Sequence, residues 1–424
     1  MSALAGIRVI ELAHERCALA GKLLADMGAD VIVIEPLAGA AARRYAPFAG
    51  DVPDPERSLH WWHYNTSKRG MALDWNVPQG REALLTLIAG GDLLLEAEDP
   101  GVLAAAGLGD DALTGAMPRL IHVSITPFGP DGPRASEQAT DLTILASGGV
   151  TAVCGYDDHD LPPIRPMGDH GYAMGEHFAV QAALTALIFR EAGGQGQKID
   201  VSLNAAANVT TELSSYTWLV AQEQVQRQTG RHAGTNPSMP TQYRCKDGRY
   251  VNTGLPPRTA KQYTLMLEWF RQHGFDKDFP ETVFLEMGTH HPVLDISRVG
   301  IDDEITAIFG AAREALAYAS SQMTAYDFFE SAQKANIPVG IIYSPDEAFE
   351  DPHYKHRGFQ VEMDQPQLGR KVLYPGAPYA LPASPWRLSR VAPMLGEHTD
   401  EVLAEAGIDV EELRRSGAIL NSSA

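Results

Sequence analysis

Apolar and polar residues follow two different periods within the first 35 positions of the chain. Residues 8–12 (RVIEL) and 30–35 (DVIVIE) are short apolar runs with the length and β-branched content of buried strands. Between them, apolar residues recur at helical spacing from Cys17 to Met27, and Gly28 ends the pattern. This order predicts a strand, a helix and a second strand, the unit from which parallel sheets covered by helices are built.

The same rhythm continues through residue 203 and returns near the end of the chain. We expect a helix at 79–90, strands at 92–96 and 120–126, a helix at 171–191, a strand at 198–203 and a late helix at 395–406. The long helix is followed by a glycine-rich stretch, which is a common helix stop. The predicted fold class is therefore α/β.

The sequence pattern changes in the middle third of the chain. Residues 226–252 are polar and rich in turn residues, helical patterns dominate 261–333, and an apolar run near 337–341 returns to strand. From this change we predict three parts. They are 1–224, the N-terminal part of a large domain, 225–325, a small domain, and 326–424, a C-terminal segment that returns to the large domain.

The turn after the first predicted strand excludes a familiar class of nucleotide-binding proteins. Residues 13–18 (AHERCA) lack the Gly-x-Gly-x-x-Gly pattern that brings a backbone close to a dinucleotide pyrophosphate. The sequence also has no Gly-x-x-x-x-Gly-Lys-Ser/Thr loop. The chain is thus predicted to be neither a dinucleotide-dependent dehydrogenase nor a P-loop kinase.

Net charge and cysteine content narrow the functional classes further. The 424 residues include 54 acidic and 34 basic side chains, and the net charge of −20 disfavours nucleic acid and anionic membranes as partners. Cys17, Cys154 and Cys245 form no CxxC pair, so neither a disulfide framework nor a zinc site is expected. Because the sequence shows neither a leader pattern nor an 18-residue apolar run, a cytoplasmic location is predicted.

Seven short segments form an ordered set over nearly the whole chain. They are Asn65 to Arg69 with Leu73-Asp74, Pro166 to Asp169, Gly193 to Ser202, Asn336 to Gly340, Asp351-Pro352 with Arg357-Gly358, Pro375 to Pro378, and Leu395 to Thr399. This set resembles the family III CoA-transferases, which include formyl-CoA transferase, carnitine CoA-transferase and α-methylacyl-CoA racemase.

The resemblance implies an architecture and a substrate class. The architecture is a large Rossmann-like domain plus a smaller α+β domain, with two chains interlocked like linked rings in a homodimer. The implied substrates are an acyl-CoA and a carboxylic acid, so that coenzyme A enters as substrate and no cofactor is bound permanently.

Asp169 lies directly before the predicted helix 171–191 and has two interpretations. The pattern alone indicates a helix N-cap, where aspartate is favoured. The resemblance instead implies that Asp169 is the carboxylate nucleophile. The two roles are compatible, because a helix N-terminus stabilises an ionised carboxylate by about 0.3–1 kcal/mol. In the implied reaction the aspartate attacks an acyl-CoA, CoA thiolate converts the product into aspartyl-CoA, and the acceptor acid reverses the sequence.

The resemblance also implies five contacts to coenzyme A. Lys68 and Arg69 match a basic pair that faces CoA phosphates, although the pattern alone indicates a solvated turn. Arg16 lies in the first strand-to-helix turn, and Ala97 and Phe128 follow two of the predicted strands. These five residues are the predicted CoA site.

The chain departs from the family pattern at two positions. A family arginine that grips CoA corresponds to Ala105, so we expect Arg43 or Arg44 to hold the nucleotide end, or the affinity to be reduced. The histidine of the racemase branch corresponds to Thr140, before Asp141, and α-proton exchange usually needs two groups. Two alternatives stay open: an acyl-CoA racemase or epimerase of the same fold, and a subunit of a heteromeric CoA-transferase.

The remaining polar clusters lead to no metal prediction. Residues 157–160 indicate a solvated acidic loop, and the histidine pair at 290–291 also indicates a loop. The stretch 60–64 (HWWHY) indicates core or dimer-interface packing, with an apolar wall for an aromatic acyl group as its functional alternative. His170, next to Asp169, is a candidate for lining the site.

Overall fold

The computed structural model describes residues 2–254 and 256–421, and the chain forms two compact units. Unit 1 consists of Met1–Ala152, Ile164–Ala221 and Pro352–Ala424, and unit 2 consists of Val153–Pro163 and Gln222–Asp351. Unit 1 is therefore assembled from three separate stretches of the sequence.

Unit 1 is built on a six-stranded parallel sheet with the strand order β3-β2-β1-β4-β5-β6. The mixed α/β class predicted from the sequence is confirmed. The strands are β1 (Arg8–Leu12), β2 (Asp30–Glu35), β3 (Arg69–Ala72), β4 (Leu93–Glu96), β5 (Ile121–Thr126) and β6 (Lys198–Ser202).

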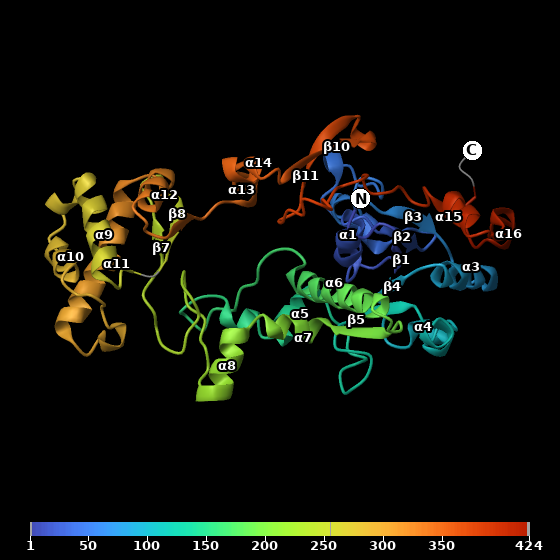
Figure 1. The fold of residues 1–424 in the computed structure, drawn as a ribbon, viewed down its shortest axis with the longest axis horizontal. Coiled ribbons are helices and arrows are strands. Elements are labelled where there is room, and N and C mark those ends of the chain that lie inside the picture. The colour runs from blue at the N-terminus through green and yellow to red at the C-terminus, as the bar shows by residue number, and fades with distance from the viewer. Residues whose placement is uncertain (1, 255, 422–424) are drawn as a thin grey trace. The chain divides into compact units, whose positions relative to one another are not determined.

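Helices cover both faces of this sheet because successive strand residues point to opposite sides. Val9 and Val123 belong to the core that α1 and α6 form on one face. Ile10 and Leu94 belong to the core on the other face, with α3, α15 and α16. Figure 1 shows α6 running beside β5. These helices are α1 (Ala18–Asp26), α3 (Pro78–Ala89), α6 (His170–Glu191), α15 (Thr399–Glu405) and α16 (Val410–Ser416).

Shorter elements of unit 1 connect and flank these layers. The β10–β11 hairpin is antiparallel and separate from the large sheet. These elements are α2 (Leu59–Tyr64), α4 (Val102–Ala105), α5 (Asp141–Ser147), α7 (Leu203–Val209), α8 (Glu212–Ala221), α14 (Pro352–His356), β10 (Gln360–Gln365) and β11 (Arg370–Pro375).

Unit 2 combines a three-stranded antiparallel sheet, β7-β8-β9, with a bundle of helices. Its own core is aromatic, with Tyr263, Trp269, Phe270 and Phe328 all buried. Its elements are β7 (Gln242–Arg244), β8 (Tyr250–Thr253), α9 (Ala260–Gln272), α10 (Thr282–Gly288), α11 (Asp303–Gln322), α12 (Ala325–Lys334), β9 (Val339–Ile341) and α13 (Pro345–Glu350).

The end of unit 2 differs from the predicted boundary of the small domain at 325. Strand β9 pairs with β8, so the chain leaves unit 2 only after Asp351. Within residues 2–254 and 256–421, no helix combines the length and apolar character needed to cross a bilayer.

Candidate active site

Asp169 stands at the N-terminal end of α6 without capping the helix. It occupies the N-cap position, yet within the described residues its side chain makes no capping hydrogen bond. Asp141 of α5 takes that role, since its Oδ1 accepts from the backbone N–H groups of Gly171 at 2.6 Å and Tyr172 at 3.1 Å. Because Asp141 satisfies these donors, the Asp169 carboxylate is left for other partners.

The hydrogen-bond partner of Asp169 is His60, the second residue of α2. His60 Nε2 lies 3.1 Å from Asp169 Oδ2. This bond is the main reason that the pKa of Asp169 lies below its ordinary value, and the charge of the Arg165 guanidinium lowers the pKa further. Asp169 is therefore ionised at neutral pH, and its side chain is 37% exposed, which gives a substrate access.

Aromatic rings surround the His60–Asp169 pair. Tyr45 meets the His60 ring edge-on with centroids 5.3 Å apart, and the Tyr64 ring lies 4.7 Å away. The Tyr45 hydroxyl donates to Glu15 Oε2 at 2.5 Å. Burial and this bond raise the pKa of Tyr45 to about 12, and burial raises the pKa of Tyr64 to about 12. Both phenols are consequently neutral at physiological pH.

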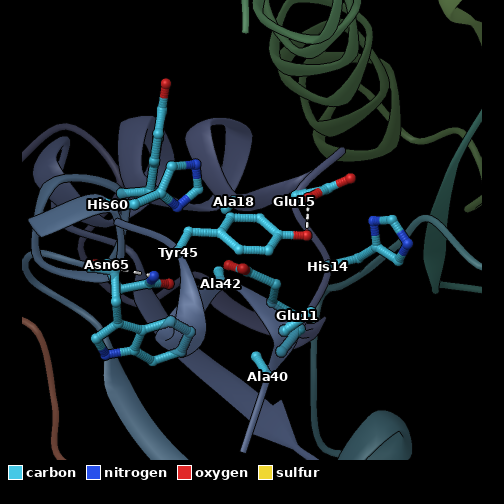
Figure 2. Close-up of a pocket in the computed structure, with 13 residues that line it drawn as sticks. Glu11, His14, Glu15, Ala18, Ala40, Ala42, Tyr45, His60 and Asn65 are labelled. Carbon is cyan, nitrogen blue, oxygen red and sulfur yellow. Dashed lines mark hydrogen bonds between the residues drawn. The ribbon is translucent and has the colours of Figure 1, made fainter. Parts of the chain in front are cut away.

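A cavity of about 120 Å³ opens beside the His60 ring, and Figure 2 shows its lining. The Tyr45 ring lies between His60 and His14 and points its hydroxyl at Glu15. Small, aromatic and acidic side chains form the wall: Glu11, Ala13, His14, Glu15, Ala18, Ala40, Ala41, Ala42, Tyr45, His60, Trp61, Tyr64 and Asn65. The alanines leave space and the rings supply apolar surface, which suits an apolar or aromatic group.

The stretch 60–64 contributes to the core and to the cavity together. Trp61 and Trp62 are buried in a core cluster of their own, in line with the packing interpretation of this stretch. His60, Trp61 and Tyr64 also line the cavity, in line with the alternative interpretation.

Arg16 and Ala97, two of the predicted CoA contacts, meet at the carboxyl edge of the sheet. Arg16 Nη2 donates to the Ala97 carbonyl oxygen at 2.6 Å and to Asp99 Oδ1 at 3.0 Å, and lies 3.3 Å from His14 Nε2. Burial, together with the Arg16 charge, lowers the pKa of His14 to about 4, so this imidazole is neutral. Phe128 follows β5 at the same edge and is partly buried.

Lys68, also predicted to contact CoA, makes its hydrogen bonds inside the fold. Its buried ammonium donates to Glu11 Oε1 at 2.8 Å, to the Ala18 carbonyl oxygen at 2.9 Å and to Asn65 Oδ1 at 2.9 Å. A lysine ammonium has three N–H groups, and these bonds occupy all of them. A CoA phosphate would have to displace a protein acceptor to bind here.

Arg69, the last predicted CoA contact, holds the C-terminal segment against the sheet. Its guanidinium pairs with Asp30, Glu401 and Glu405 at 2.8–2.9 Å. Five hydrogen bonds to these carboxylates use all five N–H groups of the side chain. The structure thus brings Arg16 and Ala97 together and places Lys68 and Arg69 in the framework of unit 1.

The two arginines expected to substitute for a residue at Ala105 lie in different environments. Arg43 is fully buried, with bonds of 2.6 and 2.9 Å to Glu35 and of 2.9 Å to Glu56. Arg44 is exposed. Of the two guanidinium groups, that of Arg44 is the accessible one.

The other polar clusters form local pairs. Asp157 pairs with Arg231 at 2.6 Å, and His291 with Glu304 at 2.9 Å. Among residues 2–254 and 256–421, no group of three or more His, Cys, Asp or Glu side chains is arranged to hold a metal ion.

Two features of the site escaped the sequence analysis. The His60–Asp169 bond spans 109 positions, and the bond from Asp141 to the start of α6 spans 30. Both arise from tertiary contact, so no local pattern reveals them. The unusual histidine-aromatic composition of 60–64 was the one available signal.

The site combines a parallel sheet covered on both faces with an ionised carboxylate, Asp169, whose partner His60 lines an aromatic cavity, an arrangement compatible with an α/β enzyme. Comparison with known proteins places it in a family. Residues 4–399 match the sequence pattern that defines CoA-transferase family III. The chain therefore belongs to CoA-transferase family III, as the resemblance predicted, and it is an enzyme of the CoA-transferase class.

Individual relatives agree with this assignment. A subunit of succinyl-CoA:(R)-benzylsuccinate CoA-transferase from Thauera aromatica is 31% identical over 415 residues, 97% of each chain. The succinate–glutarate CoA-transferase of Agrobacterium fabrum is 28% identical over 412 residues, 95% of each chain. The crystal structure of a CAIB/BAIF family protein from Brucella suis has the same fold, with a TM-score of 0.75 and 24% identity over 96% of this chain and 99% of that chain.

Proposed function

We propose that this CoA-transferase moves coenzyme A from an acyl-CoA to a carboxylic acid, with Asp169 as the covalent carrier. The observation that supports the proposal most directly is the carboxylate itself, which is ionised, accessible and not engaged in capping α6. An ionised carboxylate is the form that attacks a thioester.

The proposed reaction proceeds through two acylated forms of Asp169. The carboxylate attacks the acyl-CoA carbonyl, which gives an acyl-aspartyl anhydride and CoA thiolate. The thiolate then attacks the aspartyl carbonyl, which gives aspartyl-CoA and the donor acid. The acceptor acid repeats these steps in reverse, so the thioester energy is conserved rather than lost to water.

The substrate proposal combines the cavity with the relatives. Both relatives described above are named for succinyl or succinate, which makes succinyl-CoA the first donor to test. The alanines and aromatic rings of the cavity favour an acceptor with an apolar or aromatic substituent. We further propose that Arg16, Ala97 and Phe128 line the path of CoA along the carboxyl edge of the sheet.

The test is transfer activity together with trapping of the covalent form. Wild-type enzyme given succinyl-CoA and a panel of carboxylic acids should form new acyl-CoA. Without acceptor, hydroxylamine should convert Asp169 into a hydroxamate, detected by peptide mass, because a thioester reacts and a carboxylate does not. Asp169→Asn should abolish both signals while α6 keeps its Asp141 cap. Asp303→Asn, an exposed change at the start of α11, is the matched control.

A normal turnover rate in folded Asp169→Asn would disprove the carrier role. The racemase alternative is tested in parallel with a 2-methylacyl-CoA in deuterated water. In the structure Thr140 caps α5 with a reciprocal hydrogen-bond pair to Thr143, which is a structural role. We expect the α-carbon to stay unlabelled, and labelling at the rate of turnover would favour the racemase.

We also propose that the chain works as a dimer. Every residue of α8 is at least partly exposed, including apolar Leu213, Tyr216, Leu219 and Val220. Exposed apolar area of this kind marks protein interfaces. The Thauera aromatica relative is named as a subunit, so a second, different chain is the alternative partner to a second copy.

A further inference from the structure

His60 has a defined hydrogen position in its bond to Asp169. An ionised carboxylate only accepts hydrogen bonds, so the 3.1 Å contact requires the hydrogen to be on Nε2. His60 Nδ1 is buried and, among the described residues, has no hydrogen-bond partner. The carboxylate therefore selects the state in which Nε2 carries a hydrogen and donates it to Asp169.

The helix that carries His60 is firmly anchored on both sides of the ring. Trp61 Nε1 donates to the Pro393 carbonyl oxygen at 3.0 Å, and Trp62 Nε1 donates to the Glu56 carbonyl oxygen at 3.0 Å. Ser58 caps the helix by accepting from the Trp61 backbone N–H at 3.3 Å. A donor fixed before the reaction begins is the kind that stabilises developing charge most effectively, because little reorganisation is needed.

We propose that His60 is a catalytic hydrogen-bond donor, whose Nε2–H stabilises the negative charge that develops on the side-chain carbonyl oxygen of acylated Asp169. The inference rests on the proposed function, because it requires Asp169 to be the covalent carrier. It adds His60 as the group that polarises the aspartyl carbonyl and so makes its carbon easier for a nucleophile to attack.

The bonds made and broken at Asp169 balance without a proton transfer. In the anhydride, Oδ1 joins Asp169 to the donor acyl carbon and Oδ2 is the carbonyl oxygen. CoA thiolate adds to Cγ, and the electron pair of the carbonyl bond moves onto Oδ2, where the His60 Nε2–H meets it. The carbonyl bond then re-forms, the bond from Cγ to Oδ1 breaks, and the donor acid leaves as a carboxylate carrying Oδ1.

The acceptor acid passes through the same kind of intermediate in the other direction. Its carboxylate adds to Cγ of aspartyl-CoA, negative charge again collects on Oδ2, and CoA thiolate leaves. One fixed donor therefore serves both halves of the transfer, and the ring holds its hydrogen throughout.

The kinetic test compares variants with and without an N–H at this position. His60→Phe keeps an aromatic ring between Tyr45 and Tyr64 but has no donor, and we expect kcat to fall about 10²–10³-fold, as for loss of an oxyanion donor. The KM for acyl-CoA should stay near the wild-type value. His60→Gln retains an N–H and should recover at least part of the lost rate. His177→Gln, an exposed change on α6, is the matched control and should match wild type.

A spectroscopic readout separates catalysis from packing. Enzyme labelled with ¹³C-aspartate and loaded with succinyl-CoA without acceptor should show an isotope-sensitive infrared band of the aspartyl-CoA carbonyl. Loss of the hydrogen bond strengthens that carbonyl, so the band should shift to higher frequency in His60→Phe and return toward wild type in His60→Gln. If His60→Phe does not fold, His60→Leu provides the donorless variant.

The outcomes distinguish this inference from the proposed function. If wild type transfers CoA and His60→Phe keeps either the wild-type kcat or the wild-type band position, the role of His60 is overturned and that of Asp169 stands. If wild type forms neither product nor covalent band, the proposed function itself fails. Asp169→Asn should show no band and so identifies the signal.

Discussion

The carboxyl groups on and beside α6 differ in pKa because their surroundings differ. The pKa of Asp169 is lowered, chiefly by the His60 hydrogen bond. The pKa of Asp141 is raised, chiefly by burial, although two backbone N–H groups oppose the shift. Glu176 is 2% exposed, and burial raises its pKa to about 8. Asp169 is thus ionised at neutral pH, whereas Glu176 stays protonated in the core.

Glu176 makes the stability of the fold depend on pH. Between its ordinary value of 4.5 and about 8, the folded state keeps a proton that the unfolded state releases, so stability falls as pH rises. The slope approaches about 1.4 kcal/mol per pH unit in that window. Glu176→Gln, which imitates the protonated acid, should remove this slope and raise the free energy of unfolding most at pH 8.

Urea unfolding measured from pH 5 to 8 tests this prediction. Glu176 contacts the Ala20 backbone N–H at 2.9 Å and feels the charges of Lys68 and Glu11, which stay in place in the variant. Glu82→Gln on the exposed side of α3 is the matched control and should preserve the wild-type slope. Parallel stability curves for wild type and Glu176→Gln would contradict the assignment.

At the scale of elements, Asp141, and not the N-cap residue Asp169, supplies the side-chain cap at the start of α6. Asp141→Ala removes the acceptor for the N–H groups of Gly171 and Tyr172. We expect a loss of about 1–3 kcal/mol in unfolding free energy, because these donors are then left unsatisfied. The first turn of α6 should fray, and kcat should fall because Asp169 loses its fixed position.

Hydrogen–deuterium exchange of the peptide that covers residues 169–175 measures this fraying directly. Asp141→Asn keeps an acceptor oxygen and should exchange more slowly than Asp141→Ala. Protection of that peptide at the wild-type level in Asp141→Ala would show that the cap lies elsewhere.

The elements with a clear period were predicted well from the sequence. The long helix, expected at 171–191, is α6 at His170–Glu191, and the first two strands have the predicted bounds. Strand β3 was missed because its short RGMA sequence has no alternation and forms by pairing with β2. The exposed helix α8 was missed because each of its residues is at least partly exposed, so no buried stripe marks it in the sequence.

The candidate site was predictable only where one residue carries the signal. The carrier role of Asp169 was predicted from its motif and stays a prediction, and Arg16, predicted in the first strand-to-helix turn, contacts Ala97 in the structure. The burial of Lys68 depends on Glu11, which is 57 positions away, so its basic character alone indicated a surface role. The ion-pair partners of a charged residue are set by tertiary contact, so the sequence pattern around it does not identify them.

At the scale of the whole molecule, the apolar face of α8 predicts self-association. Leu219 and Val220 are 75% and 85% exposed, and a second chain of 45.9 kDa would cover them. Light scattering should give about twice the chain mass at micromolar concentration. The double change Leu219→Asp with Val220→Asp should produce monomer or insoluble protein, because charges would then enter the interface.

Ile301→Asp provides the control, since Ile301 is 81% exposed in unit 2 and lies away from α8 in the sequence. It should leave the mass unchanged. A wild-type mass of one chain would overturn the homodimer. Recovery of activity on adding a different chain would then support the heteromeric alternative.

The order in which the chain is synthesised gives the last segment a special part in folding. Val402, Leu403 and Leu413 cover part of one face of the sheet, and Arg69 forms ion pairs with Glu401 and Glu405. The sheet strands are complete at Ser202, nearly 200 positions before α15 begins. At about 5–20 residues per second, the part of this face that α15 and α16 cover, beside α3, stays open for roughly 10–40 s on the ribosome. Chaperones therefore have a long interval in which to bind the nascent sheet.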